Sequence, residues 1–312
     1  MRLGVFFAPW GPAASVSGVE QAVRQAESSG FETVWTGDHL LFPKVQNSRY
    51  PYSSQSQSPF HAETPVLEAV TLLAYLAGIT DTIGLGISVY VLPLRDPILS
   101  AKQLANVQTL SQGRLIVGIG IGWLREEFAA LGVSFSNRGE LTDEYITAIH
   151  HLWRGAGEPF RAKHLSFEPV GFAPKPEPTP PLIIGGNSER ALRRAARLGD
   201  GWHPLRLGPR ETRAGIDRLA RFAELEHRDP TSLRVVLRTS LLELGVLNQG
   251  PPDEGDRLQS VVCQSLEQYR SAGVTEFVIE FQYPESPPER QVEWLQWFGE
   301  QGVTRLFKSE TI

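Results

Sequence analysis

The sequence predicts an α/β fold, a (β/α)8 TIM barrel with extended loops after strands two, four and seven. Short apolar runs alternate with stretches that carry apolar residues at helical spacing, and this unit occurs eight times. Strict alternation gives a parallel sheet with right-handed crossovers, and eight units in 312 residues suit one closed barrel. The rival, an open doubly wound sheet, requires a glycine-rich turn after the first strand, where this chain has APWGPAAS.

The N-terminal half contains four of the expected strands. Residues 2–8 are nearly all apolar, as in a strand buried on both faces, and a helical stripe that ends at Gly30 follows them. Thr64 and Pro65 form an N-cap and first-turn pair for a later helix. The other elements of this half are expected as strands at 33–36, 82–87 and 114–120, and as helices at 96–113 and 143–153.

The C-terminal half continues the alternation after an irregular stretch at 155–181, which we expect to hold a small hairpin around 163–172. Segments 40–63 and 244–256 have no period, so we expect them to be loops that determine specificity. The remaining strands are expected at 182–184, at 201–203, within 233–244 and at 275–281, and the helices at 191–198, 216–225, 266–272 and 292–298.

Composition excludes several classes of protein. No linker or charge block divides the chain, so we expect a single domain over residues 1–312. The net charge of −5, without a basic cluster, argues against nucleic acid as a partner. One cysteine, Cys263, rules out an internal disulfide and fits a cytoplasmic protein. No apolar run approaches the roughly 20 residues of a membrane helix, so a membrane partner is not expected. The expected partner is a small-molecule substrate.

Polar and aromatic residues follow the expected strands at their C-terminal ends, where barrel enzymes place their active sites. The set has few carboxylates and no obvious nucleophile with its base. Its members are Trp10, Asp38, His39, the segment 88–94, Gly120, Gly122, Trp123, Gly185, Gly186, Asn187 and His203.

Gly185, Gly186 and Asn187 lie between an apolar strand and a striped helix. Free backbone N–H groups and the helix dipole make such a junction a candidate phosphate site, and glycine allows close approach. The alternative is an ordinary tight turn with an asparagine cap.

Gly118, Gly120 and Gly122 alternate along the fourth strand. They either leave room for bulky barrel neighbours or let a flat ring lie against the backbone, with Trp123 as its wall. The glutamates at 126–127 are expected in a solvated first helical turn.

Asp38 and His39 allow three interpretations: a metal pair, a hydrogen-bonded pair, or a general acid. Zinc needs three or four ligands, and although His61 and His203 are candidates, no HxH or HExxH spacing occurs, so no metal is expected. An imidazole that acts as a general acid or contacts a cofactor is favoured, because histidine titrates near neutrality.

Four segments carry a resemblance to a known family: FETVWTGDHL (31–40), IGLGISVYVLPLRDP (83–97), GRLIVGIGIGW (113–123) and PLIIGGNSERALRRAARLGDGWHP (181–204). The whole chain resembles the bacterial-luciferase-like monooxygenase superfamily, and specifically its branch dependent on coenzyme F420. The resemblance implies a (β/α)8 barrel, usually a homodimer, with a flavin or deazaflavin at its C-terminal mouth.

The resemblance also assigns residues. Asp38 and His39 match the pair that contacts the deazaflavin, with the histidine close to the reacting carbon. Ser88 and Val89 match a non-prolyl cis peptide whose bulge backs the central ring. The remaining matches are backbone contacts at Gly120 and Gly122 and the phosphate-contacting turn at Gly185 and Gly186, to which we add Asn187.

The chain departs from the F420-dependent sugar-phosphate dehydrogenases at two positions. Those enzymes have a carboxylate after the strand-four glycines, where this chain has Trp123, and a tryptophan in the strand-two loop, where it has Phe42. A sugar phosphate is therefore not the expected substrate. For the anionic tail of F420, Arg95 and Arg125 are candidate partners.

These observations predict an F420-dependent oxidoreductase that moves a hydride between the deazaflavin and an apolar or aromatic substrate. His39 is the expected catalytic residue, and Asp38 is expected to orient it or the ring. Two alternatives stay open: an FMN-dependent monooxygenase on the same barrel, and a barrel that binds a ligand without catalysis. The substrate pocket is expected to be shaped by Trp10, Phe42, Trp123 and His203.

Overall fold

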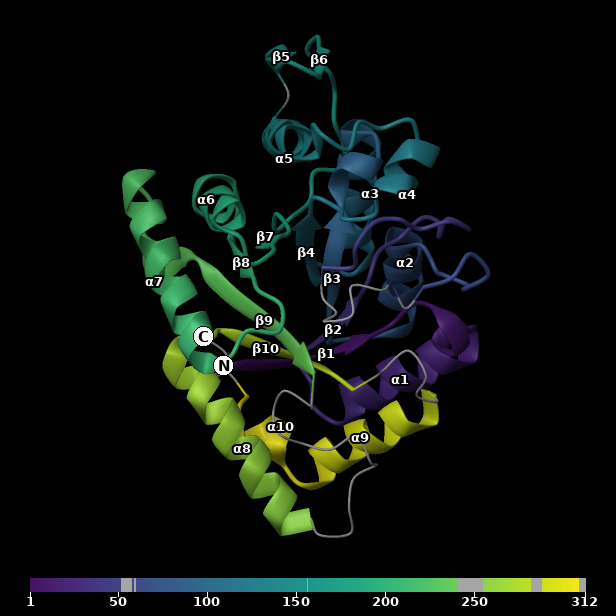
Figure 1. Cartoon of the computed structure of the whole chain (residues 1–312), viewed down its shortest axis with the longest axis vertical. Coiled ribbons are helices and arrows are strands. Elements are labelled where there is room, and N and C mark those ends of the chain that lie inside the picture. The colour runs from purple at the N-terminus through teal and green to yellow at the C-terminus, as the bar shows by residue number, and fades with distance from the viewer. Residues whose placement is uncertain (52–57, 59, 156, 241–254, 282–287, 309–312) are drawn as a thin grey trace.

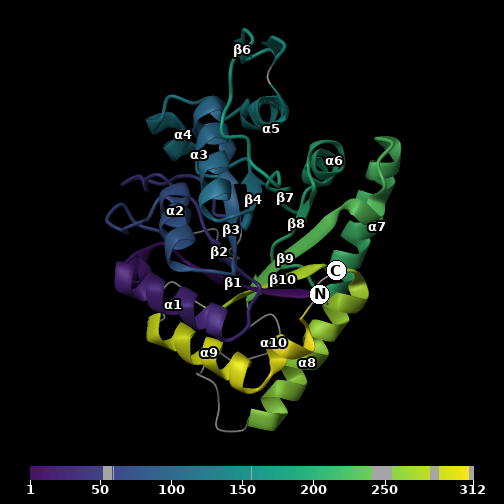
Figure 2. The same cartoon turned by 180° about the vertical axis from the view of Figure 1, so that it is seen from behind.

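A computed structural model describes residues 1–51, 58, 60–155, 157–240, 255–281 and 288–308. Eight strands close into a barrel in the order β1-β10-β9-β8-β7-β4-β3-β2, and every neighbouring pair is parallel. Helices surround the strands on the outside (Figures 1 and 2). The predicted (β/α)8 barrel is confirmed.

The elements follow the predicted alternation. The barrel strands are β1 (Arg2–Phe7), β2 (Thr33–Thr36), β3 (Gly84–Val91), β4 (Leu115–Gly120), β7 (Leu182–Gly185), β8 (Gly201–His203), β9 (Arg234–Ser240) and β10 (Glu276–Glu280). The helices are α1 (Val16–Ser28), α2 (Ala69–Ile79), α3 (Pro97–Leu110), α4 (Arg125–Ala130), α5 (Arg138–Arg154), α6 (Glu189–Leu198), α7 (Pro209–Leu225), α8 (Gly255–Ala272), α9 (Pro288–Glu300) and α10 (Val303–Leu306).

The barrel interior is packed with side chains below its mouth. One apolar cluster fills it, while a larger cluster lies between the strands and the outer helices. Trp35 is fully buried there, and its Nε1 donates to Glu276 at 2.8 Å. The space for a ligand therefore lies above this layer, at the C-terminal ends of the strands. The inner cluster comprises Phe6, Ala8, Trp35, Ile116, Ile183, Val236 and Val278.

Helix α2 begins later than the sequence predicts, so the expected cap at Thr64 and Pro65 is wrong. Residues 64–68 instead run extended beside the loop after β1, where Leu67 N–H donates to the Pro9 carbonyl at 2.8 Å. Glu68 is the actual N-cap. Backbone pairing with a distant loop has overridden a local helix signal.

The predicted hairpin exists but lies slightly earlier, as β5 (Phe160–Arg161) and β6 (Ser166–Phe167), and it projects beyond α5 in both views (Figures 1 and 2). Helices α5 and α7 begin earlier than predicted. The connections after β2 and β4 are long, as predicted. The third predicted loop, after β9, lies outside the described residues. None of the described helices has the length and apolar character needed to cross a membrane.

Candidate functional site

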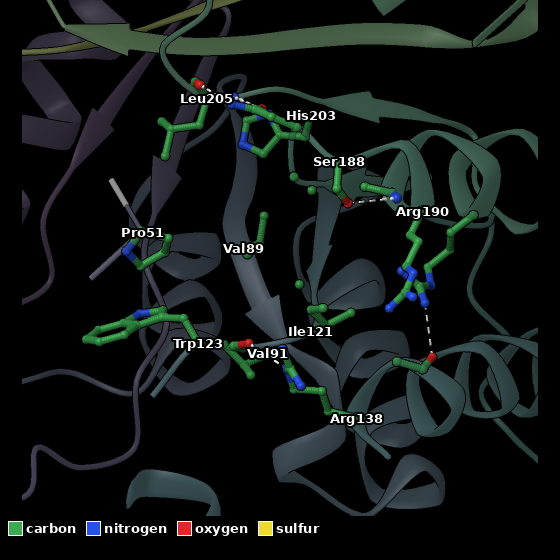
Figure 3. Close-up of a pocket in the computed structure, with 18 of the residues that line it drawn as sticks. Pro51, Val89, Val91, Ile121, Trp123, Arg138, Ser188, Arg190, His203 and Leu205 are labelled. Carbon is green, nitrogen blue, oxygen red and sulfur yellow. Dashed lines mark hydrogen bonds between the residues drawn. The ribbon is translucent and has the colours of Figure 1, made fainter. Parts of the chain in front are cut away.

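A cavity of about 1720 Å³ lies at the C-terminal ends of the barrel strands, and Figure 3 shows its wall. All but one of the residues predicted for the site line it. The exception is Phe42, whose buried ring lies behind His39 and stacks on Phe60 with centroids 4.7 Å apart, so its predicted place in the pocket wall is wrong. The predicted residues that line the cavity are Trp10, Asp38, His39, Ser88, Val89, Gly120, Gly122, Trp123, Gly185, Gly186, Asn187 and His203.

The peptide bond between Ser88 and Val89 is cis, as the resemblance implied. The pairing of β3 with β4 shifts at this point, and the Val89 side chain lies in the middle of the cavity wall (Figure 3). A Cβ on Gly185 would lie 2.7 Å from Val89 Cγ1, and one on Gly120 would collide with Val89 Cγ2. These glycines therefore leave room for a bulky neighbour, and Val89 presents the apolar surface to a ligand.

Gly122 is required for a different reason. Its φ of +78° suits glycine, and a Cβ there would lie 2.6 Å from the Phe128 ring. The chain thus turns tightly after β4, and this turn places Trp123 on the cavity wall.

His203 forms a buried hydrogen-bonded network under the bulge. Its Nδ1 donates to the Val236 carbonyl, and its Nε2 lies 2.7 Å from Ser88 Oγ. Because a carbonyl only accepts, Nδ1 carries the proton and Ser88 donates to Nε2. Arg238 in turn donates to the Ser88 carbonyl at 3.1 Å.

Burial lowers the pKa of His203 to about 4, against the smaller effect of its hydrogen bond to Val236, which raises it. The imidazole is therefore neutral at neutral pH, with both nitrogens engaged by protein groups. His203 supports the position of Ser88 and the bulge, and it is a wall residue with no free nitrogen to offer a substrate.

Asp38 holds the end of β3. Its carboxylate accepts from Val91 N–H at 2.9 Å and from two nitrogens of Arg95 at 2.8 and 2.7 Å. Within the described residues it makes no hydrogen bond to His39, so the expectation that Asp38 orients this histidine is wrong. Arg95 also pairs with Glu68 at 3.0 Å, and this engagement removes it as a candidate partner for a cofactor tail.

His39 is oriented by a residue that the sequence placed in solvent. Its Nδ1 lies 2.9 Å from Oε2 of Glu127, which is only 1% exposed. The other oxygen of Glu127 accepts from Leu40 N–H at 2.7 Å. Three aromatic rings surround the imidazole, with centroids 5.0 to 5.9 Å away: Phe42, Phe60 and Trp123.

Glu126, the neighbour of Glu127 on α4, also contacts the loop after β2. It accepts from Asn47 N–H and Ser48 Oγ, each at 2.7 Å. The prediction that both glutamates are merely solvated is therefore wrong: α4 holds the long loop, and through it the wall of the cavity, by two carboxylates.

The Gly185–Gly186 turn lies across the cavity from these groups. Gly186 has φ +115°, and Ser188 rather than Asn187 caps α6 by accepting from Ala191 N–H at 3.2 Å. The Asn187 side chain instead spans to the backbone of Leu205, donating at 2.8 Å and accepting at 3.0 Å. Asn187 thus braces the turn. Gly186 donates its N–H to the His203 carbonyl at 3.2 Å and accepts from Trp202 Nε1 at 2.8 Å, so the groups left for a ligand at this junction are the first N–H groups of α6.

Arginines line the cavity beside this turn, and the predicted site did not include them. Among the described residues, neither Arg190 nor Arg138 has a carboxylate partner. Arg138 donates to the Gly122 carbonyl, and its guanidinium lies 3.8 Å from the centre of the Phe135 ring. Arg125 lies 4.3 Å over the same ring and does not line the cavity. The sequence feature that could have indicated these arginines is the run RALRRAAR at 190–197, shortly after the glycine turn.

One group of potential metal ligands lies at α5 and the hairpin, and of its members Glu140 also lines the cavity. Glu140, Glu144 and His164 have ligand atoms within 4.8 Å of one another, but Lys163 bonds to both oxygens of Glu140 at 2.9 Å. His61, which the sequence offered as a weak candidate, does not line the cavity.

Comparison with known proteins agrees with the geometry. Residues 1–242 match the family model described as luciferase-like monooxygenase. An uncharacterized protein of Mycobacterium tuberculosis is 26% identical over 289 residues, 91% of this chain and 93% of that protein. The FMNH2-dependent dimethylsulfone monooxygenase of Pseudomonas fluorescens is 30% identical over 181 residues, 57% of this chain and 44% of that protein.

Solved structures share the fold. An F420-dependent secondary alcohol dehydrogenase, in complex with an F420–acetone adduct, superimposes with a TM-score of 0.74 at 15% identity. The match covers 95% of this chain and 97% of that one.

Proposed function

The chain belongs to the luciferase-like monooxygenase family, whose members are oxidoreductases or monooxygenases that act on small molecules, and we propose that it is an F420-dependent oxidoreductase. Its substrate in this proposal is an apolar or aromatic organic molecule. We further propose that residues 1–312 form one domain, which pairs as a homodimer in the cytoplasm. The relatives named above include both an F420 enzyme and an FMNH2 enzyme, so the choice of cofactor rests on this chain's own residues.

The observation that carries the proposal is that His39 and Val89 line the same cavity. A histidine that follows an aspartate at the end of the second strand is what the resemblance associates with deazaflavin. Its imidazole is held in place by a buried hydrogen bond, and aromatic rings exclude water around it.

The electrostatics of the cavity also favour F420. Eight arginines and five carboxylates line it, so the cavity is positive although the chain carries −5. FMN ends in a single phosphate, whereas F420 continues into an anionic tail. Arg138 and Arg190, which have no carboxylate partner among the described residues, extend the positive surface beyond the glycine turn.

A tricyclic ring with a phosphate fits the residues present. Val89 offers an apolar surface, and α6, which begins just after Gly186, has N–H groups in its first turn that lack intrahelical acceptors and suit a phosphate. The volume of about 1720 Å³ exceeds that of most small-molecule sites, so it admits both a cofactor and a substrate. The residues that would hold the group are Val89, Gly185, Gly186, Asn187, Arg138 and Arg190.

Bound F420 would supply hydride transfer, and the protein would supply position and electrostatics. His39 would accept or hold a proton at Nε2, the nitrogen that Glu127 leaves free. Trp10 and Trp123 would enclose the substrate and exclude water. Asp38 would act indirectly, because its bonds to Arg95 and to Val91 hold the end of the strand that carries Val89.

A titration tests the cofactor. Adding purified protein to F420 should change the fluorescence of the deazaflavin with saturation, while FMN should respond weakly or not at all. A Gly186→Asp variant serves as the control, because a carboxylate at the glycine turn repels a phosphate. Tight FMN binding without an F420 response reverses the assignment.

The second candidate, an FMN-dependent monooxygenase, is favoured by the 30% identity to the dimethylsulfone enzyme. It predicts oxygen consumption that depends on reduced FMN and on substrate. A barrel that binds a ligand without catalysis predicts cofactor-independent binding and no turnover. The hydrogen bond from His39, which lines the cavity, to the buried carboxylate of Glu127 argues against that third possibility.

A further inference from the structure

Glu127 is a buried carboxylate that contacts the proposed catalytic histidine from outside the cavity. It lies on α4, is 1% exposed, and does not line the cavity. Oε1 accepts from Leu40 N–H at 2.7 Å and lies 3.4 Å from Leu41 N, and Oε2 lies 2.9 Å from Nδ1 of His39. A carboxylate buried to this degree needs partners, and within the part of the chain that the structure describes its hydrogen-bond partners belong to the segment that presents His39.

The direction of these bonds determines where the imidazole carries its proton. A carboxylate is an acceptor on both oxygens, so His39 must donate from Nδ1. In a neutral imidazole Nε2 then holds a lone pair, and no group among the described residues bonds to it. Since His39 lines the cavity, Nε2 is the nitrogen that meets a ligand.

We propose that Glu127 is a positioning residue, which fixes the tautomer and the ring orientation of His39 so that Nε2 faces the cavity as a hydrogen-bond acceptor. In functional terms this rests on the proposed oxidoreductase. It implies a substrate that presents an O–H or N–H donor near the reacting carbon, because an acceptor nitrogen recognises a donor.

The same geometry excludes Asp38 from this role, although it is adjacent in sequence. Both oxygens of Asp38 are engaged by Arg95 and by Val91 N–H. The stabilisation of a histidine by a carboxylate is common in catalytic sites, where the carboxylate sets the tautomer. Here it comes from a residue 88 positions away in sequence.

A Glu127→Gln variant keeps the shape of the side chain but should reverse the tautomer of His39. The two backbone N–H groups keep the amide oxygen on the Leu40 side, so the amide NH2 faces His39. Since NH2 only donates, Nδ1 must become the acceptor and the proton must move to Nε2. Glu126→Gln is the matched control, because Glu126 lies on the same helix and holds the same loop at Asn47 and Ser48.

The experiment is ¹⁵N NMR of protein labelled at its seven histidines, at pH 9, without cofactor. A His39→Gln variant identifies the signal of His39. The wild type and Glu126→Gln should show Nδ1 protonated, and Glu127→Gln should show the proton on Nε2. Circular dichroism confirms that each variant is folded.

A wild-type spectrum with an unprotonated Nδ1 overturns the proposal by itself, even where Glu127→Gln fails to fold. An unchanged His39 signal in folded Glu127→Gln also overturns it. Because no cofactor is present, either result is independent of whether F420 or FMN binds, so failure of this inference is distinct from failure of the proposed function.

Discussion

Acid should destabilise this protein through His203. Its pKa is about 4 in the folded chain, because the ring is buried, compared with about 6.5 for an unfolded histidine. The unfolded state therefore binds the proton first, so this stability is complete above about pH 6.5 and is lost as the pH falls toward 4. A shift of this size corresponds to roughly 3 kcal/mol in all, of which about 2 kcal/mol is lost between pH 7.5 and pH 5.

Urea unfolding, followed by tryptophan fluorescence at pH 7.5 and pH 5, measures this loss. A His203→Asn variant keeps a donor for the Val236 carbonyl but has no titratable ring, so it should lose about 2 kcal/mol less than the wild type between the two pH values. Carboxylates such as Glu68, whose pKa is lowered by hydrogen bonds to Thr71 despite burial, also lose stability in acid. That contribution is common to all variants and cancels.

The control is His61→Asn, because His61 is exposed and outside the cavity. It should lose as much stability in acid as the wild type does. If the wild type and His203→Asn lose the same free energy of unfolding between pH 7.5 and pH 5, then His203 is not held neutral, and the account of the network under the bulge is wrong.

Three further changes test the site. Asp38→Asn leaves Arg95 buried without its full charge partner and should lower the free energy of unfolding by roughly 3 kcal/mol in urea titrations; unchanged stability would show that this ion pair is dispensable. His39→Ala should reduce turnover by about 10²–10⁴-fold while the cofactor Kd stays within a few-fold, and equal turnover would remove its catalytic role. Gly186→Ala, at φ +115°, should weaken cofactor binding by roughly tenfold in fluorescence titrations. Gly132→Ala, also at positive φ but outside the cavity, should leave cofactor binding unchanged, and equal effects in the two variants would refute a cofactor role for the glycine turn.

The barrel was predictable because its signals are local. Each strand is a short apolar run, and each helix carries its own stripe, so the eight units appear without knowledge of any contact. Once the strands were assigned, the rule that barrel sites lie at the C-terminal ends of strands placed Trp10, His39 and His203 on one cavity.

The errors occur where a distant partner decides the local structure. Thr64 and Pro65 have the residue types of a helix start, but hydrogen bonds to the loop after β1 keep this segment extended. Phe42 lies in a loop without a period, so nothing in the sequence indicates that its ring packs behind His39 rather than toward the cavity. Adjacency in sequence was informative only inside regular elements.

The two acids near His39 show the same limit in chemical terms. Asp38 is adjacent to the histidine in sequence, but its carboxylate binds Arg95 and the Val91 N–H and not the imidazole. The sequence predicts a solvated helical turn for Glu127, but α4 packs against the loop after β2 and buries this carboxylate beside the imidazole. The acid that can set the proton of His39 is therefore determined by the packing of α4, and the adjacent acid is left to secure the strand that carries Val89.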